Sequence, residues 1–273
     1  MRRFLTICMS PLVFAALMPA LTAQQAAPAP DVREIIRRAL EAEEQNGLLT
    51  RPYTWKQREV EKQLDAGGAV KSQEVKTWEI SPLYDERYAH LTRKNDKALE
   101  PRDQRREDER FEKFVSKRKS ETPAERKSRL DDLKKERDES RGFLRDFPNA
   151  YNFRLAGEEQ IDGNATWVID ATPRQDFHPT QPHGDLLPKI KGRLWIEKKG
   201  YHWVRVDAEA VDTIAIGVVI ARIHPGSRGR FERVLVNNEV WMPRRFYFNA
   251  GARVALVKSV TVEQVVEFSD FRK

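Results

Sequence analysis

The sequence predicts an α+β protein that is mostly antiparallel β, with about eleven strands, one N-terminal helix and a helical insert. Three observations favour this fold class. From residue 150 onward, turn-forming pairs recur at short spacing and separate runs rich in β-branched and aromatic residues. All six tryptophans fall in strand-like runs. Residues 93–145 instead combine helix-forming residues with charges. Strands joined by short turns form antiparallel meanders, and a sheet this large usually curls.

The first 23 residues have the order of a secretory signal peptide. Arg2 and Arg3 are followed by a largely apolar run over 4–18, and a polar stretch begins after Ala23. We therefore predict cleavage after Ala23, an Ala/Pro/Gln-rich leader over 24–30, and a single domain over 31–273. The alternative, an uncleaved membrane anchor, needs about 20 apolar residues, and this run is shorter. The expected location is the periplasm, with outer-membrane association as an alternative.

The single cysteine lies in the predicted signal peptide, so the mature chain would have none. One cysteine excludes a disulfide framework and a cysteine-based zinc site. A chain of this length without cysteine suits an oxidising compartment and can bury most of its unfolded surface in one core. Net charge falls from +7 for the whole sequence to about +5 after cleavage, because only Arg2 and Arg3 are removed.

Residues 31–45 are expected to form a helix. Asp31 is a suitable N-cap, and Asn46-Gly47 is typical of a helix end. The apolar residues between them recur at the spacing of one helix face: Val32, Ile35, Ile36, Ala39 and Leu40.

Alternating runs predict strands on both sides of the charged insert. Three precede it, at 53–65, 70–80 and 84–94, and Gly67-Gly68 marks a hairpin turn between the first two. Eight follow it, at 152–159, 165–172, 192–197, 201–211, 214–223, 231–236, 240–249 and 254–268.

The insert is dense in charge of both signs. Residues 93–141 hold 18 basic and 14 acidic residues and no glycine. We expect two helices, over 102–119 and 123–145, with Pro123 at the start of the second. A nucleic-acid-binding arm is the alternative, but the charges nearly cancel and the protein is expected to be exported. Solvated helix faces with i,i+4 ion pairs explain the composition better.

No catalytic signature is found, and we expect a protein that is not an enzyme and has no cofactor. One cluster, Asp176 to Asp185, contains His178 and His183 and could belong to a metal-dependent hydrolase. Pro179 and Pro182 favour an exposed loop instead. The sequence lacks a nucleophile-elbow motif, a zinc-protease motif and a phosphate-binding glycine loop. We therefore predict no metal site.

Several strands are apolar at consecutive positions. Residues 214–220 and Phe246-Tyr247-Phe248 are examples. An antiparallel sheet with one solvated face would alternate instead. Two explanations remain open: both faces are covered by protein, or one face lines an apolar cavity.

Motifs in the later strands resemble the outer-membrane lipoprotein-sorting carrier family (LolA-like). Gly192-Arg193-Leu194-Trp195-Ile196-Glu197, followed by Trp203-Val204-Arg205-Val206, is similar to its "G-x-L-W-I-D … R" strand pair, with Glu197 in place of Asp. Residues 163–173 resemble a family strand that runs into a proline, and residues 240–243 resemble its "x-W-x-P" strand. The superfamily also includes the lipoprotein receptor of the outer membrane (LolB-like) and RseB-type periplasmic regulators.

The resemblance implies a half-open β-barrel whose apolar cavity binds a lipid or the acyl chains of a lipoprotein. The residues expected to line it are Trp167, Leu194, Trp195, Ile196, Trp203, Trp241 and Phe246. Only one strand parity can face the cavity, so we do not expect all seven to do so. The alternative is a regulatory or scaffold protein of the same fold, whose charged insert (93–145) binds an envelope protein partner.

Overall fold

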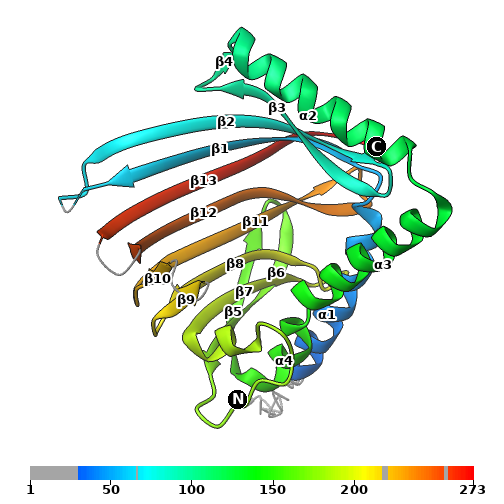
Figure 1. Cartoon of the computed structure of the whole chain (residues 1–273). Helices are drawn as coiled ribbons and strands as arrows, with labels where there is room; N and C mark the ends of the chain where they lie inside the picture. The colour runs from blue at the N-terminus through cyan, green and yellow to red at the C-terminus, as the bar shows by residue number, and fades with distance from the viewer. Residues whose placement is uncertain (1–29, 66, 217–220, 255–257) are drawn as a thin grey trace, which may run out of the picture. The chain divides into compact units, whose positions relative to one another are not determined.

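A long, strongly curved antiparallel sheet forms the body of the protein, and helices cover part of it (Figure 1). The computed structural model describes residues 30–65, 67–216, 221–254 and 258–273. The predicted signal peptide (1–23) and residues 24–29 of the predicted leader lie outside the described residues. Within the described ranges, no helix is both long enough and apolar enough to cross a membrane.

Eleven strands form one continuous path in the order β4-β3-β2-β1-β13-β12-β11-β8-β7-β6-β5. The sequence predicted a large antiparallel sheet of about eleven strands, without their order. Two further short strands, β9 and β10, pair with each other, and β10 also pairs with β12. The bounds are β1 Thr54–Leu64, β2 Val70–Leu83, β3 Glu86–Lys94, β4 Lys97–Ala98, β5 Tyr151–Ile161, β6 Asn164–Pro173, β7 Ile190–Glu197, β8 Trp203–Ala210, β9 Ile214–Ile216, β10 Ala221–Ile223, β11 Arg228–Val236, β12 Val240–Val254 and β13 Lys258–Arg272.

The sheet curls but does not close. Its two end strands, β4 and β5, do not pair with each other. The hairpin of β5 and β6 folds back across the sheet, so that Asp162 in its turn pairs with Arg244 of β12 at 2.5 Å (Figure 1). Three strands (β7, β8 and β11) separate β6 from β12 along the sheet, so this contact requires strong curvature. The result is the open, half-barrel architecture that the sequence predicted.

Two strand predictions were wrong. The run over 214–223 was expected to be one strand, but β9 and β10 pair antiparallel with each other, with Ala221 opposite Ile216. A turn was expected at Ala250-Gly251, but β12 continues to Val254 and Gly251 pairs with Thr261 of β13. In both places local composition was a weaker determinant than pairing with neighbouring strands.

Helix α1 (Val32–Leu49) begins as predicted, because the Asp31 side chain accepts a hydrogen bond from the Arg33 backbone N–H. The predicted stop at Asn46-Gly47 was wrong, since the helix continues for one further turn. The Asn46 side chain is 2% exposed and bonds to the backbone of Trp241, which keeps this residue inside the helix.

The predicted apolar stripe of α1 packs into the main hydrophobic core. This core also receives α4 (Phe143–Ala150), the short 3-10 helix η1 (Gly184–Lys189) and one side of strands β5 to β8. Its members, in the order of the chain, are Ile35, Ile36, Ala39, Phe147, Ala150, Tyr151, Trp167, Ile169, Ala171, Leu187, Leu194 and Ile196. The core therefore lies over strands β5 to β8, and the second half of α1 reaches β11 through the Glu43–Arg233 ion pair and β12 through Asn46.

The insert forms α2 (Pro101–Lys119) and α3 (Pro123–Ser140). Helix α2 lies beside β3, where Phe111 and Phe114 contact the Tyr88 ring at centroid distances of 5.3 and 4.8 Å. Helix α3 buries none of its residues. It ends at Ser140 rather than at 145 as predicted, because the chain turns at Arg141 and α4 begins at Phe143.

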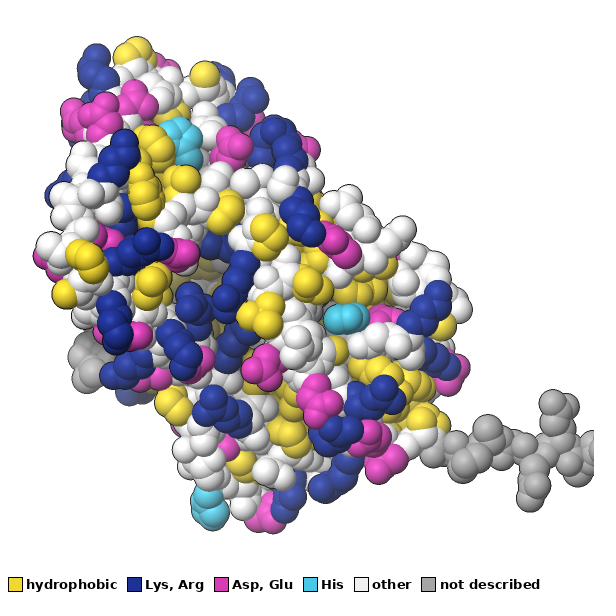
Figure 2. All heavy atoms as spheres, turned by 90° about the vertical axis from the view of Figure 1, so that its right-hand side faces the viewer, with side chains coloured by type: hydrophobic (Ala, Val, Ile, Leu, Met, Phe, Trp, Pro, Cys, Tyr) yellow, Lys and Arg dark blue, Asp and Glu magenta, His cyan; other side chains and the backbone are white. Residues whose placement is uncertain are grey.

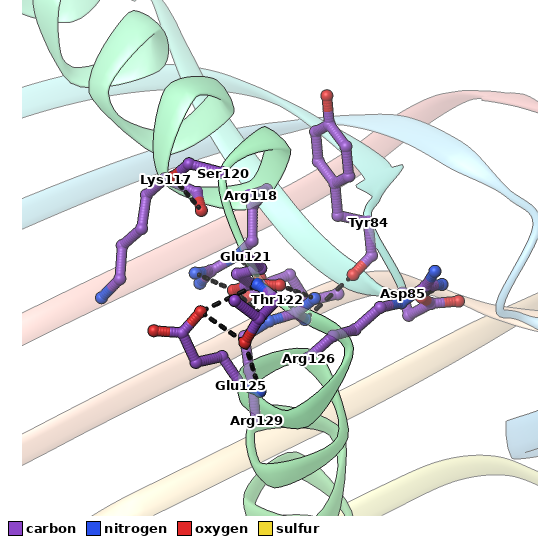
Figure 3. A network of polar contacts seen from close by, with 11 residues as sticks. Tyr84, Asp85, Lys117, Arg118, Ser120, Glu121, Thr122, Glu125, Arg126 and Arg129 are labelled. Atoms are coloured by element: carbon purple, nitrogen blue, oxygen red, sulfur yellow. Dashed lines mark hydrogen bonds and ion pairs between the residues drawn. The ribbon is translucent and has the colours of Figure 1, made fainter.

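A network of ion pairs fixes the junction of α2 and α3 to the turn between β2 and β3 (Figure 3). Arg118 pairs with Glu86 at 2.5 Å and with Glu121 at 2.9 Å, and Arg129 pairs with Glu121 at 2.8 Å. These four side chains are mostly buried, so water screens their interactions less than it screens surface pairs. A capping box between Thr122 and Glu125 starts α3 at this point. The first turn of α3 is thus well anchored, while the rest of the helix is solvated.

Asp146 of α4 organises the proline-containing loop that precedes η1. Its carboxylate is 4% exposed and accepts hydrogen bonds from the Thr180 N–H (2.9 Å), the Thr180 hydroxyl (2.6 Å) and the Gln181 N–H (3.0 Å). Burial raises the pKa of this carboxyl, but the three hydrogen bonds outweigh burial and hold the pKa below its usual value.

Asp146→Asn is expected to lower the free energy of unfolding by about 1–3 kcal/mol at neutral pH, since hydrogen bonds to a buried carboxylate are lost. A lowered folded-state pKa stabilises the protein above the unfolded value near 4 and stops doing so as pH falls through the folded value. Urea unfolding from pH 7 to pH 2.5 should therefore show the two proteins converging in acid. A difference that stays constant over this range would contradict the assignment.

Candidate ligand-binding site

The register of the strands divides the sheet into two faces with different chemistry. Residues directly opposite each other in antiparallel strands point to the same face. We call the face that carries Ile169 and Leu194 the helix face, because both residues pack in the core with α1. The opposite face carries Asp170, Arg193 and Asp207, which are opposite one another in register, and we call it the charged face.

A complete row of apolar residues crosses the helix face from β5 to β12. Each residue is opposite the next in register: Leu155, Ile169, Leu194, Val206, Phe231 and Phe246. The β6 and β7 members are buried in the core, whereas Phe231 and Phe246 are half-buried. Phe246 stacks on Phe248, with ring centroids 6.3 Å apart and planes 13° apart.

A row of small residues runs beside this apolar row on the same face. Gly192 of β7, Ala208 of β8 and Gly229 of β11 are opposite one another, and Phe248 of β12 continues the row. A Cβ atom built on Gly229 would have only the Tyr247 carbonyl oxygen (3.8 Å) and the Phe248 ring (3.9 Å) within 4 Å. One built on Gly192 would have only the Asp207 carbonyl oxygen, at 3.3 Å. No helix atom of the described residues lies within 4 Å of either Cβ position.

We call this strip of small residues, together with the apolar row beside it, the trough. Its floor is Gly192, Ala208 and Gly229, which span about 10 Å at the usual strand spacing. One side is the apolar row, and Phe248 closes the β12 end. Neither glycine has a positive φ among the described backbone angles, so the backbone does not require glycine at either position. The effect of glycine at these two positions is therefore to leave space on the sheet surface, not to permit a turn.

The charged face holds a cavity of about 1030 Å³, on the side toward which the β5–β6 hairpin folds. Its charged lining residues are Arg154, Asp170, Lys191, Arg193, Arg205, Asp207, Glu209, Arg228, Arg230, Glu232 and Arg245. They come from six strands, β5 to β8 together with β11 and β12. The cavity is thus polar, unlike the trough on the other face.

Three carboxylates in this cavity are each shared by two cations. Asp170 pairs with Arg154 and with Arg193, the latter at 2.6 Å. Both guanidinium groups, Arg193 above all, hold the pKa of Asp170 below its usual value. Because the carboxylate stays ionised at neutral pH, each such cluster keeps one net positive charge.

The other two clusters repeat this arrangement. Asp207 pairs with Arg205 (2.8 Å) and Arg230 (2.7 Å), and Glu209 pairs with Lys191 (3.0 Å) and Arg228 (3.2 Å). Burial raises the pKa of Asp207, but its two arginines outweigh burial and lower the pKa overall. Lys191 and Arg228 lower the pKa of Glu209.

The structure separates the seven residues that the sequence proposed as cavity lining. Leu194 and Phe246 belong to the apolar row beside the trough. Trp167, Ile196 and Trp203 lie farther along the same face, in or against the core. Trp241 is buried beside the end of α1. Trp195 is on the charged face, where its indole N–H donates to Glu159 (2.8 Å) and Arg205 stacks on its ring.

The histidine-containing segment from Asp176 to Asp185 forms a loop that leads into η1. Asp176 pairs with Arg174 at 2.7 Å, and His183 has a left-handed backbone (φ 62°) just before η1. Among the described residues, no group of three or more His, Cys, Asp or Glu side chains lies together as metal ligands would.

Sequence reasoning missed the residues that define both surfaces. Strand β8 and strand β11 alternate small or apolar residues with charged ones, as in Val206-Asp207-Ala208-Glu209 and Arg228-Gly229-Arg230-Phe231. This alternation is the signal that could have identified them. Without the register, however, nothing shows that the glycines of β7 and β11 lie in one row.

No protein-family model matches the sequence, and no curated protein matches it. Several solved structures match this chain over most of its length, at low identity and with low TM-scores. A LolA superfamily protein from Nitrosomonas europaea is 12% identical, with 89% of this chain and 94% of that chain covered and a TM-score of 0.31. An outer membrane lipoprotein-sorting protein domain from Vibrio parahaemolyticus is 10% identical, with 87% and 92% covered and a TM-score of 0.31. The MucA/MucB complex of Pseudomonas aeruginosa is 9% identical, with 89% of this chain and 99% of that chain covered and a TM-score of 0.24.

Proposed function

We propose that this protein is a non-enzymatic envelope protein that binds the acyl chain of a lipid or lipoprotein in the trough on the helix face. The observation that carries the proposal is the row of small residues, Gly192, Ala208 and Gly229, beside a continuous apolar row on the same face. A floor of two glycines and an alanine beside an apolar row suits a narrow, flexible hydrocarbon chain. The resemblance of the β7–β8 strand motifs to lipoprotein-sorting carriers is consistent with this ligand class.

The energetics favour reversible binding. Fully burying a methylene group contributes about 0.8 kcal/mol, and association costs about 4–15 kcal/mol in lost freedom of motion. A shallow trough buries only one side of each methylene, so one short acyl chain should bind weakly and longer or multiple chains more tightly. Such a ligand can be released to a tighter acceptor, as a carrier role requires.

The proposal is tested with the mature chain, residues 24–273, purified from the envelope. Native mass spectrometry and solvent extraction would identify any lipid that accompanies it, and titration with palmitate would measure uptake. We expect a bound acyl species, or saturable palmitate binding that tightens as the acyl chain lengthens. A bare protein that also ignores palmitate and longer-chain fatty acids would refute the proposal.

Helix α3 favours a second candidate function, the binding of an envelope protein partner through the insert. The helix buries no residue, yet the ion-pair network holds its first turn in place (Figure 3). Acidic and basic side chains intermingle on the face of the molecule shown in Figure 2, so a partner would need an equally mixed charge pattern. An anchored but unpartnered helix is consistent with recognition and contributes little to the core.

Reversing two charges on α3 tests this second function. Lys134→Glu with Lys135→Glu should abolish crosslinking to an envelope partner without changing palmitate binding, because both side chains are exposed. The matched control, Lys71→Glu with Lys97→Glu, changes the same charges on exposed strand positions away from α3. Equal crosslinking of the α3 variant and the control would rule out recognition through this helix.

A further inference from the structure

We propose that the cavity on the charged face is a binding site for a small molecule with at least two phosphate or carboxylate groups. The side chains that carry its charge lie on the opposite face of the sheet from the trough, and the strands at Gly192, Ala208 and Gly229 lie between the two surfaces, since these residues also line the cavity. Its volume of about 1030 Å³ is at the upper end of the usual range for small-molecule sites.

The cavity has an excess of positive charge. Its lining contains seven basic side chains, those of Arg154, Lys191, Arg193, Arg205, Arg228, Arg230 and Arg245. It contains four carboxylates, those of Asp170, Asp207, Glu209 and Glu232. Arg245 lies opposite Glu232 and Glu267 in register but forms no ion pair within 4 Å in the described part of the chain. Arginine presents five N–H donors in a planar fork, so a guanidinium already bonded to one carboxylate can still donate to a ligand oxygen.

Part of this positive surface is held in a fixed geometry before any ligand binds. The Arg205 guanidinium lies 4.3 Å from the centre of the Trp195 ring, and Glu159 fixes the indole by accepting from its N–H. Arg205 and Arg230 each donate two hydrogen bonds to Asp207. Side chains that are already ordered lose less conformational freedom on binding, which favours affinity.

Ion pairs elsewhere on this face of the sheet lack this excess of cations. On β1 and β13, Lys62 pairs with Glu263 and Lys56 with Asp270, one to one. Arg58 lies beside two carboxylates, those of Asp96 and Glu267. Ion pairs whose only role was to stabilise the sheet would need no more cations than carboxylates. Inside the cavity, three successive clusters each keep a surplus charge.

The positions of the three clusters favour a ligand with more than one anionic group. Arg193 of the first cluster is opposite Asp207 of the second, and Lys191 of the third is opposite Glu209 in the same strand pair. The three surplus charges therefore occupy neighbouring positions in the curved sheet. A ligand with a single anionic group would neutralise one of them, whereas two or three groups would neutralise the cavity.

Isothermal titration calorimetry in low salt, with pyrophosphate and citrate as probes, tests the proposal. We expect the wild-type mature chain to bind at least one probe at one site, more weakly as salt rises. Pyrophosphate but not citrate would identify a phosphate ligand, and the reverse a polycarboxylate. Arg230→Gln should weaken binding about tenfold or more, as expected for loss of a charge-assisted hydrogen bond.

Two further variants keep the test decisive. Arg245→Gln removes a cavity cation that has no ion-pair partner among the described residues, so it should weaken binding without affecting the unfolding midpoint. Arg58→Gln removes an ion-paired arginine on the same face but outside the cavity and should leave binding unchanged. Failure of both probes to bind, or equal weakening by Arg58→Gln and Arg245→Gln, would overturn the proposal. Palmitate binding should be the same in all three variants.

Discussion

Gly229→Leu should abolish palmitate binding while leaving the protein folded. The leucine side chain would lie on the floor of the trough, between Phe231 and Phe248, and occupy the space proposed for the acyl chain. A Cβ atom at this position meets no described atom closer than 3.8 Å, so the substitution causes no clash at its base. Replacing a strand glycine also reduces the entropy of the unfolded chain, which favours the folded state by about 0.5–1 kcal/mol.

The combination of lost binding and unchanged or raised stability distinguishes this prediction from simple damage. Palmitate titration and thermal unfolding would be measured on the same preparation. Gly67→Leu, in the β1–β2 turn, is the matched control, because it adds the same side chain at an exposed site remote from the trough. Ala208→Leu should reproduce the loss of binding. Normal palmitate affinity in Gly229→Leu would show that the acyl chain binds elsewhere.

The general architecture could be predicted from the sequence because it depends on local periodicity. The apolar spacing of Ile35, Ile36 and Ala39 determines which side of α1 is buried, and the turn-forming pairs after residue 150 mark most strand ends. Errors arose where a long-range contact overrides a local signal. Asn46 reads as a helix stop, but its hydrogen bonds to Trp241, 195 positions away, keep it helical.

The candidate sites were much less predictable, because they depend on register. Trp195 and Leu194 are neighbours in an apolar run, yet one contributes to the charged cavity and the other to the apolar row. A shift of one residue in pairing would exchange the two faces. Hydropathy alone favours the large aromatic residues as ligand contacts. In the structure, Gly192 and Gly229 contribute to the proposed trough because they leave its floor without side chains.

Asn46→Ala should lower the free energy of unfolding by about 2–5 kcal/mol, a large share of the stability of an ordinary domain. The Asn46 amide donates to the Trp241 carbonyl and accepts from the Trp241 N–H, both at 2.8 Å. Strand β13 pairs with β12 only from Arg245 onward, so no strand of the described ranges pairs with Trp241 on that side. Asn46 takes the place of the missing strand, and alanine would leave two buried backbone groups unpaired.

Urea unfolding of Asn46→Ala, compared with Asn152→Ala, would measure this effect. Asn152 is exposed on β5 and makes no side-chain hydrogen bond with the described residues, so its replacement should change stability by less than about 0.5 kcal/mol. Helix α1 would keep its contacts through Ile35 and Ile36, because they pack in a core cluster that has no member from β12. We therefore expect the variant to fold and to retain its trough, with palmitate affinity close to wild type under native conditions. A stability loss as small as that of Asn152→Ala would mean that water replaces the amide at Trp241, and the end of α1 would then be a frayed terminus instead of a fixed support for β12.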